Sequence, residues 1–323
     1  MPSDLWAGAG TTTADILKIN QGARPAGMAG VYTAMGDDGY SVDYNPAGLA
    51  PMRASQVILL HLTSLADISY ENLIFATPVG NDSTLASNFE YRYSPPINNQ
   101  PGNPLVPPVS TDDLLGSLSY ALQFSGGLRV GATFKYVKSD LASFSASAIA
   151  VDLGAQLESK LPWGLRVGLS IQNLGTGMSF TQAYSGSTAT SASLPMFIRL
   201  GIGTHQVIDQ KKDLNVGIEI FKPSDQDIKL AAGMEYWAFP DLFAVRGGYK
   251  LENFSVIGET FGATTVHTPN AFTDYTLGFT LTRRIDTDDF SLDVAYDPAN
   301  FVSTTEATFF FALNFKFNQL RIF

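Results

Sequence analysis

The chain has 323 residues, no cysteine, 15% charged residues, 12% aromatic residues and a net charge of −10. Charged residues usually make up about 25% of a soluble protein, so this composition favours a β-barrel whose outer face meets lipid. The lack of cysteine excludes a disulfide framework and a thiolate metal site, and a pI near 4.7 without a basic cluster argues against nucleic-acid binding.

The chain begins with a tail over residues 1–21, in which we expect Thr13–Ile19 to form a short helix capped by a threonine. No run of the chain approaches the ~18 apolar residues of a transmembrane helix. Residues 1–20 also lack the charged-then-apolar layout of a signal peptide. We therefore expect that the signal peptide of an exported protein has been removed from this sequence.

The next segment, Gly22–Leu49, is rich in glycine, alanine and turn formers and has no helical or strand period across its length. Irregular backbone carries unpaired N–H and C=O groups, which something outside the segment has to satisfy. Because the rest of the chain has the pattern of strands, we predict two parts. Residues 1–54 form an N-terminal tail and plug, or hatch, and residues 55–323 form a barrel that encloses it.

From Ser55 onward, segments of roughly ten residues alternate between apolar and polar positions, as strands with two different faces do. About fourteen such segments can be counted, near 55–63, 68–78, 84–94, 112–125, 127–139, 144–158, 162–173, 194–205, 212–222, 226–239, 241–251, 272–284, 289–298 and 304–318. An even count suits a single-chain barrel that closes with antiparallel pairing. We predict an all-β fold, a transmembrane antiparallel β-barrel of about 14 strands with the plug inside.

Three connections are long, namely 95–111, 174–193 and 252–271, and each follows an odd-numbered strand. All three therefore leave the same end of the barrel, while most turns at the other end are short, as in outer-membrane barrels. A soluble β-sandwich also alternates, but it would leave a large apolar remainder exposed. The terminal residue Phe323 is typical of barrels folded into the outer membrane. We predict the bacterial outer membrane as the location.

The plug segment carries a composite motif made of Gly22–Gly30 (GARPAGMAG), the acidic pair Asp37–Asp38 and Asn45–Leu49 (NPAGL). This motif resembles the N-terminal signature of the PorV/PorQ family, which is similar to the FadL-type transporters of long-chain fatty acids. Pro25 and Gly36 depart from the pattern, in which small residues such as alanine are usual at these two positions.

The resemblance implies that six residues lie in the hatch that closes the lumen: Arg24, Asp37, Asp38, Asn45, Pro46 and Ala47. Asn and Asp side chains bond neighbouring backbone N–H groups and stabilise tight turns, and Pro46 fixes φ and needs no donor partner. Arg24 can hold a carboxylate of the wall or of the plug bidentately. Two roles stay open for this set, gating of the pore or packing of a static plug.

Charged residues of both signs lie at the polar positions of the strands, and we expect them to pair with one another and with the plug. They are Arg129, Asp152, Arg166, Arg199, Glu219, Lys229, Glu235, Arg246 and Asp293.

We expect no enzyme, no metal and no cofactor. His61, His205 and His267 have no metal-ligand spacing, and neither a nucleophile elbow nor a zinc-protease motif appears. The Asp37–Asp38 pair lacks the alternate-oxygen spacing of a calcium loop.

Two functions remain open, beside a third possibility, a structural barrel with no transported ligand. FadL-type relatives bind their ligand near the outside loops and release it through a lateral opening in the wall, so the resemblance implies a non-enzymatic outer-membrane barrel that passes or binds hydrophobic, fatty-acid-like small molecules. Some members of the PorV/PorQ family act in type IX secretion, so it also implies an accessory or shuttle barrel that binds partner proteins through its extracellular loops. The expected partners are outer-membrane lipid, a hydrophobic small molecule, or secreted or surface proteins, and not nucleic acid.

Overall fold

The computed structural model describes residues 11–19, 21–64, 67–96, 109–161, 163–182, 188–208, 212–239, 241–251, 275–301 and 304–317. The predictions about the loop at 252–271, most of the loop at 95–111, His267 and Phe323 lie outside the described residues.

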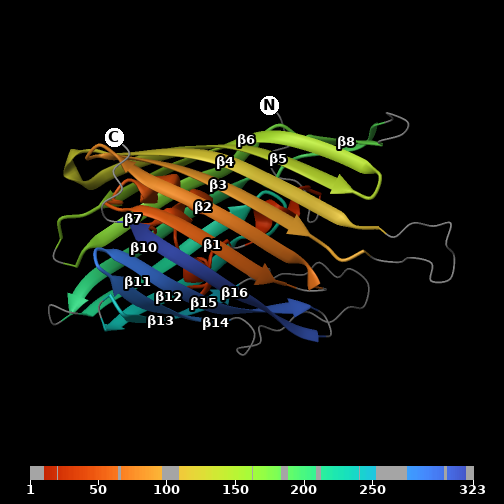
Figure 1. Cartoon of the computed structure of the whole chain (residues 1–323). Helices are drawn as coiled ribbons and strands as arrows, with labels where there is room; N and C mark the ends of the chain where they lie inside the picture. Colours follow the sequence, from red (N-terminus) through yellow and green to blue (C-terminus); the bar gives the residue numbers. More distant parts are fainter. Residues whose placement is uncertain are drawn as a thin grey trace.

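The wall is one antiparallel sheet that closes on itself (Figure 1). The ring runs through β1 (Ser55–Thr63), β2 (Ser69–Val79), β3 (Ser83–Tyr93), β4 (Thr111–Gln123), β5 (Leu128–Leu141), β6 (Phe144–Glu158), β7 (Leu165–Gly175), β10 (Phe197–Ile208), β11 (Lys212–Pro223), β12 (Lys229–Phe239), β13 (Phe243–Leu251), β14 (Tyr275–Ile285), β15 (Asp288–Phe301) and β16 (Thr304–Phe317). β1 pairs with both β2 and β16, which closes the ring. Within the described residues this is the 14-strand barrel that the alternation predicts, and the prediction is confirmed.

One part of the predicted connectivity is wrong. The segment 174–193 contains a hairpin of β8 (Met178–Gln182) and β9 (Thr188–Ala192) rather than a plain loop. β8 pairs with β6 at Phe144 and Ser145, so the hairpin extends the wall beyond the end of β7. Serine and threonine dominate this segment, and it lacks the apolar alternation by which the other strands were identified. Threonine still suits a pleated strand because it is β-branched.

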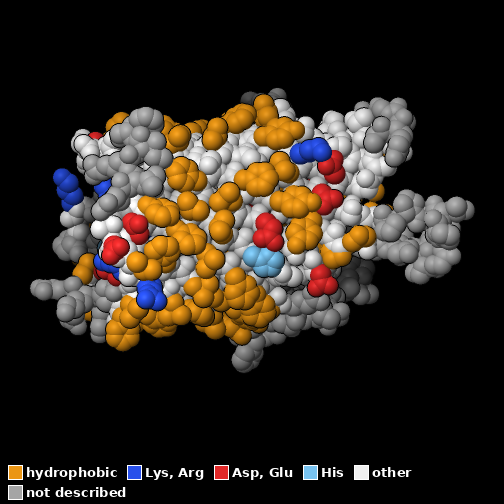
Figure 2. Space-filling model, viewed as in Figure 1, with side chains coloured by type: hydrophobic (Ala, Val, Ile, Leu, Met, Phe, Trp, Pro, Cys, Tyr) orange, Lys and Arg blue, Asp and Glu red, His pale blue; other side chains and the backbone are white. Residues whose placement is uncertain are grey.

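The outer face of the wall is apolar and the inner face is polar. On β5, for example, Phe134 is 51% exposed while its neighbour Lys135 is 4% exposed. Hydrophobic side chains cover much of the visible outer surface in Figure 2, and most of the charged side chains lie toward its two ends. This is the reverse of a soluble protein and is the arrangement of a barrel that spans a membrane.

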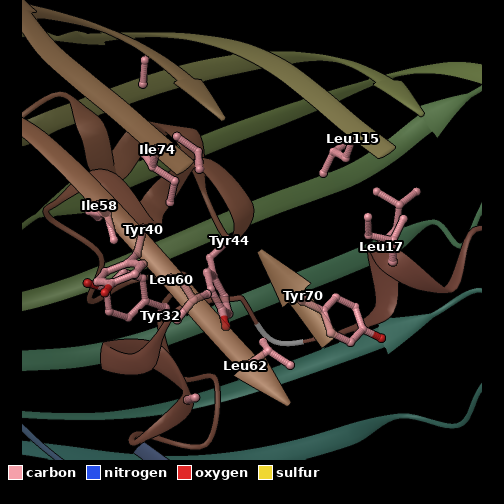
Figure 3. Close-up of a cluster of buried hydrophobic side chains, with 14 of the residues drawn as sticks. Leu17, Tyr32, Tyr40, Tyr44, Ile58, Leu60, Leu62, Tyr70, Ile74 and Leu115 are labelled. Atoms are coloured by element: carbon pink, nitrogen blue, oxygen red, sulfur yellow. The ribbon is translucent and has the colours of Figure 1, made fainter. Parts of the chain in front are cut away.

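Residues 21–54, which we call the plug, lie inside the ring and are almost wholly buried (Figure 1). They contain three short helices, α1 (Ala23–Ala26), η2 (Gly39–Asp43) and η3 (Pro46–Leu49), joined by turns. Tyr32 and Tyr40 are fully buried and pack in one cluster with Ile58 and Ile74 of the wall (Figure 3). The hydrophobic core of the protein is therefore the contact between the plug and the inner wall.

Residues 11–19, which we call the N-terminal segment, form η1 (Asp15–Lys18). The predicted threonine cap is wrong, because the residue at the N-cap position is Ala14 and no side chain caps this turn. The hydroxyl of Thr12 donates instead to Asp225, and the backbone N–H of Thr13 donates to the carbonyl oxygen of Ser193 at 3.1 Å. None of the described helices is long and apolar enough to cross a membrane.

Candidate functional site

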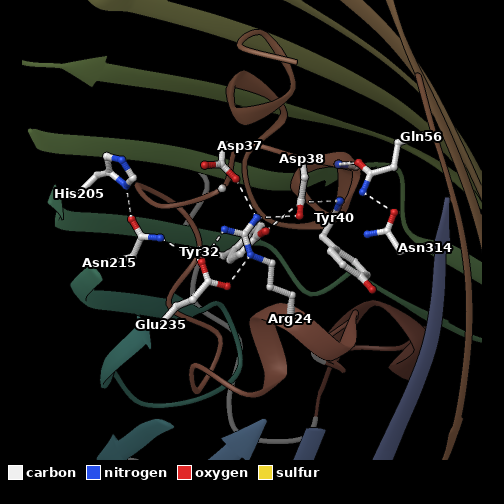
Figure 4. Close-up of polar contacts among 12 residues, drawn as sticks. Arg24, Tyr32, Asp37, Asp38, Tyr40, Gln56, His205, Asn215, Glu235 and Asn314 are labelled. Carbon is white, nitrogen blue, oxygen red and sulfur yellow. Dashed lines mark hydrogen bonds and ion pairs between the residues drawn. The ribbon is translucent and has the colours of Figure 1, made fainter. Parts of the chain in front are cut away.

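The centre of the plug is an ion pair between Arg24 and Glu235 on β12 (Figure 4). Nε and Nη2 of Arg24 each donate to one carboxylate oxygen of Glu235, both at 2.8 Å. Glu235 is fully buried and also accepts from Nε of Arg246 at 2.6 Å and from Nδ2 of Asn215 at 2.9 Å. Two cations and one amide thus hold a single wall carboxylate, an arrangement that fixes the position of α1.

The acidic pair divides its contacts between the plug and the wall. Nη1 of Arg24 donates to Asp37 at 2.7 Å and to Asp38 at 2.8 Å. Asp38 also accepts from the hydroxyl of Tyr32 at 2.8 Å and from the backbone N–H of Tyr40 at 3.0 Å, so it caps η2. Asp37 lies 3.6 Å from Nη1 of Arg166 on β7.

The charge state of Asp37 follows from these neighbours. Burial by itself would raise the pKa of Asp37, but Arg24 and then Arg166 outweigh it and hold the pKa below its ordinary value. Arginine therefore neutralises the acidic pair, and the pair serves as the link between α1, η2 and the wall.

Asn45 fixes the turn that starts η3. Its Oδ1 accepts from the backbone N–H of Ala47 at 3.1 Å, which caps η3, and its Nδ2 donates to the carbonyl oxygens of Thr33 at 2.7 Å and Ala155 at 3.0 Å. Pro46 occupies the first turn, where no intrahelical donor is needed. Asn45 and Ala47 are completely buried, so one side chain joins two turns of the plug to β6.

Wall glycines form the surface on which the plug rests. At Gly154 an added β-carbon would overlap Asn45 and Pro46, and at Gly131 it would overlap Pro46 and Ala47. Each of seven inward-facing wall glycines would bring a β-carbon closer than 3.0 Å to a plug atom: Gly131, Gly154, Gly168, Gly201, Gly203, Gly233 and Gly248. Backbone can approach backbone this closely only where the side chain is absent.

Several of these glycines are cross-strand neighbours. Gly131 pairs with Gly154, and Gly233 pairs with Gly248, so the contact surface continues from strand to strand. The sequence contained a signal for this surface, since glycine recurs among the polar positions of alternating strands.

Wall side chains satisfy the backbone of the turn around Thr33. Glu219 accepts from the backbone N–H groups of Tyr32 and Thr33, both at 2.9 Å. Nε2 of Gln156 donates to the carbonyl oxygens of Thr33 and Gly36, both at 3.1 Å. The irregular backbone of the plug is thus paired with the wall, as its composition led us to expect.

The charged residues of the inner face pair across neighbouring strands. Lys135 contacts Asp152 at 2.7 Å, and Nη1 of Arg199 donates to Glu219 at 2.9 Å. Nδ1 of His205 lies 2.7 Å from Oδ1 of Asn215, which places this histidine at the edge of the Glu235 network. Sequence reasoning expected such pairing, but it could not assign Glu219, Glu235 or Gln156 to particular plug groups.

The inner face of β2, β3 and β4 differs from that of β11 to β15. The plug bonds to it through Asp43, which accepts from Nδ2 of Asn88 at 2.9 Å, and through Gln21, which donates to Glu90. Buried polar atoms on this side lack a hydrogen-bond partner among the described residues: both amide atoms of Asn72, Oδ1 of Asn88, Oε2 of Glu90, Oδ1 of Asp113 and Oγ of Ser117, with Oδ2 of Asp43 and Oε1 of Gln21 on the plug. Burial raises the pKa of Asp43 to about 7, against the lowering effects of Lys135 and Asn88.

Toward the end of the long loops, a group of apolar side chains lines part of the lumen, beside the buried ion pair of Arg92 and Asp113. Ile16 and Leu17 of η1 are 1% and 8% exposed. They belong to the same buried cluster as the plug tyrosines, and we call the part of it around them the apolar end, made up of Leu62, Tyr70, Leu115, Met178 and Leu194. Figure 3 shows Leu17 beside Leu115 and Tyr70, apart from the tyrosines of the plug.

Polar contacts hold the N-terminal segment in this position. Nζ of Lys18 donates to Asp225 at 2.9 Å and lies 3.2 Å from Asp15. The segment therefore occupies the apolar end with two of its own side chains.

The overall fold matches known membrane channels. The structure is similar to that of the Pseudomonas putida toluene transporter TodX, with a TM-score of 0.60 and 11% identity over 93% of this chain and 98% of that chain. It is also similar to that of a Pseudomonas aeruginosa FadL homologue, with a TM-score of 0.53 and 11% identity over 96% of this chain and 100% of that chain. At this identity the similarity establishes the fold.

Sequence comparison gives the family. A protein of Treponema pallidum (strain Nichols) described as a UPF0164 protein is 25% identical over 186 residues, which cover 52% of this chain and 46% of that protein. A second UPF0164 protein of the same organism is 28% identical over 166 residues, 48% of this chain and 51% of that protein, so the chain spans about half the length of the curated relatives it matches. The profile of the family described as type IX secretion system protein PorV matches residues 7–224, more than half of the chain. The chain belongs to the PorV family.

Proposed function

We propose that this protein is a non-enzymatic barrel of the bacterial outer membrane that binds or passes hydrophobic small molecules. In this proposal residues 1–54 act as tail and plug, residues 55–323 act as the barrel, and the long loops face outward. The observation that carries it is the apolar end of the lumen, which a water-filled pore has no need of. The known structures with this fold include the toluene transporter TodX, which supports the same class of ligand.

The N-terminal segment suggests how a ligand enters. Ile16 and Leu17 fill the apolar end, so a hydrophobic molecule has to displace them to bind there. The polar contacts that hold the segment run mainly to Asp225, at one edge of the lumen. The acyl chain of a fatty acid makes the same kind of apolar contact that Ile16 and Leu17 make. Their displacement by such a molecule therefore costs little hydrophobic free energy.

The second role in this proposal is closure of the lumen, and it falls to six residues of the plug: Arg24, Asp37, Asp38, Asn45, Pro46 and Ala47. They close the lumen below the apolar end, and passage needs a movement of the plug relative to the wall. Binding at the apolar end and passage through the plug are thus separate steps with separate residues.

Oleate binding to the purified barrel tests the first step. Leu115→Asn makes the apolar end polar and should weaken oleate binding by about tenfold, whereas Leu17→Ala removes the chain's own occupant and should strengthen it. Leu161→Ala, on an exposed turn, is the control and should change nothing. Oleate binding that is insensitive to both Leu115→Asn and Leu17→Ala would contradict the proposal.

A second function is favoured by a different observation. β9 is the last strand in the order of the sheet and pairs with β8 alone among the described residues, an arrangement that suits the addition of a partner strand. Membership in the PorV family, whose description refers to type IX secretion, agrees with a barrel that receives other proteins. Replacing only β9, residues 188–192, by glycine and serine should then abolish surface retention of secreted proteins in cells. Met178 of the apolar end stays in place, so oleate binding should stay intact. Unchanged retention would contradict this second function.

A further inference from the structure

A polar pair interrupts the apolar outer face of the barrel. His61 on β1 and Glu71 on β2 are cross-strand neighbours, and Nδ1 of His61 lies 2.8 Å from Oε1 of Glu71. Their side chains are 47% and 49% exposed, so both point outward from the wall. Oγ1 of Thr63 lies 3.2 Å from the other ring nitrogen of His61.

The pair borders a hollow on the outer face. The hollow encloses about 460 Å³ and is lined by Leu59, Leu73, Phe89, Leu292, Phe311 and Leu313 in addition to the pair. Figure 2 shows the histidine and a neighbouring acidic side chain surrounded by apolar side chains. A charged side chain on a lipid-facing strand is costly unless a partner compensates it.

The level of the pair in the membrane follows from its neighbours. Tyr91 on β3 is the cross-strand partner of Glu71, and the rings of Tyr91 and Tyr93 stack with their centroids 5.6 Å apart. Tyrosines on an outer face lie at the level of the lipid head groups. Leu59 and its partner Leu313 lie two residues further along their strands, toward the end with the short turns. The hollow therefore runs from the head-group level into the hydrocarbon region.

We propose that this hollow binds a phospholipid with a primary ammonium head group. The ammonium donates to Glu71, and an acyl chain lies along Leu59, Leu73 and Leu313. Two observations carry the proposal: the carboxylate is an acceptor at head-group level, and the adjoining hollow is apolar. A phospholipid of this class supplies a cationic donor and a hydrocarbon chain in one molecule.

The same chemistry predicts which lipids the site rejects. A choline head carries the same charge but has no N–H group, so it cannot make a charge-assisted hydrogen bond. A glycerol head leaves the lipid phosphate uncompensated, and the carboxylate of Glu71 repels that phosphate. The site lies on the outer face, so it is separate from the apolar end of the lumen and goes beyond the function proposed above.

Native mass spectrometry of the intact chain tests the proposal. The barrel is equilibrated with equal amounts of phosphatidylethanolamine, phosphatidylcholine and phosphatidylglycerol that carry the same acyl chains. The ethanolamine lipid should be retained about tenfold over the choline lipid, and Glu71→Leu should reduce that ratio to about one. Leu73→Trp fills the hollow and should remove the retained lipid while Glu71 stays in place. Both variants place an apolar residue on a lipid-facing position, so the barrel should still fold.

Asp140→Asn is the matched control, because Asp140 is an exposed carboxylate near the same end and pairs with Lys138. It should keep the preference for the ethanolamine lipid. Equal retention of the three lipids by the unchanged chain would overturn the proposal, as would a preference that survives Glu71→Leu or disappears with Asp140→Asn. A dimer that is lost in Glu71→Leu would overturn it in favour of a second copy as the occupant of the hollow.

Discussion

The plug contacts the wall differently on two sides of the barrel. On the side of β11 to β15, Glu219, Glu235 and Thr276 bond directly to plug groups, and the backbone of the plug rests on wall glycines. On the side of β2 to β4, the plug makes few bonds and several buried polar atoms have no partner among the described residues. Charge-assisted hydrogen bonds in a buried site are strong, and unpaired buried polar groups are costly. The comparison suggests that the plug is anchored on one side and can separate from the wall on the other.

The largest effect should come from breaking the anchor. Arg24→Met leaves Glu235 with Arg246 and Asn215 and frees Asp37 and Asp38 from their shared cation, which should cost about 3–5 kcal/mol of plug attachment. Single-channel recordings in a planar bilayer should show frequent openings. Arg284→Met removes an exposed ion pair with Asp289 and should change the recordings little. Closed channels in Arg24→Met would show that the anchor does not hold the plug.

A smaller effect is expected from filling the surface under the plug. Gly154→Leu places a side chain where Asn45 and Pro46 lie, and overpacking of this kind costs about 1–3 kcal/mol. The melting temperature of the barrel in detergent should fall, and a protease should cut the plug more readily. Gly116→Leu is the control, because nothing lies within 4 Å of a β-carbon added there. Equal melting temperatures for the two variants would argue against close contact between plug and wall.

On the other side of the plug, we expect a substitution to stabilise the protein. Asn72 is buried and neither of its amide atoms has a partner among the described residues. Asn72→Leu removes that unpaired group and should raise the melting temperature, by an amount that corresponds to about 1 kcal/mol. Asn215→Leu on the anchored side removes a bonded amide and should lower the melting temperature instead. A loss of stability in Asn72→Leu would mean that the two sides are equally well paired.

A separate effect on the same side of the plug is a dependence on pH. The pKa of Asp43 lies at about 7 in the folded protein and near 3.8 when the residue is free, so the folded protein binds the extra proton between these two pH values. The contribution of Asp43 to stability therefore falls as pH rises from 3.8 to about 7 and is constant above that.

Asp43→Asn should remove this loss. We would measure melting temperatures from pH 4 to pH 8. The melting temperature of the variant, relative to that of the unchanged chain, should rise up to about pH 7 and then stay higher by a constant amount. Parallel curves for the two proteins would show that burial does not shift this carboxylate.

The wall could be predicted from the sequence because a membrane enforces the alternation on every strand that crosses it. The β8–β9 hairpin was missed because it has no apolar alternation to detect. The plug was recognisable by its composition and its motif, but its contacts were not predictable. Arg24 and Glu235 are 211 positions apart in the chain, and wall residues of both signs offer many possible pairings. Only the three-dimensional closure of the sheet selects one of them.

The junction of plug and wall also constrains how the protein is assembled. The plug ends directly before β1, and β1 is the strand that meets β16 to close the ring. Tyr32 and Tyr40 are fully enclosed by plug and wall. We therefore expect the plug to reach the inner face while the sheet is still open, and the last strand then to seal the barrel around it. A chain with a damaged plug should fail at this step of biogenesis, before any pore exists.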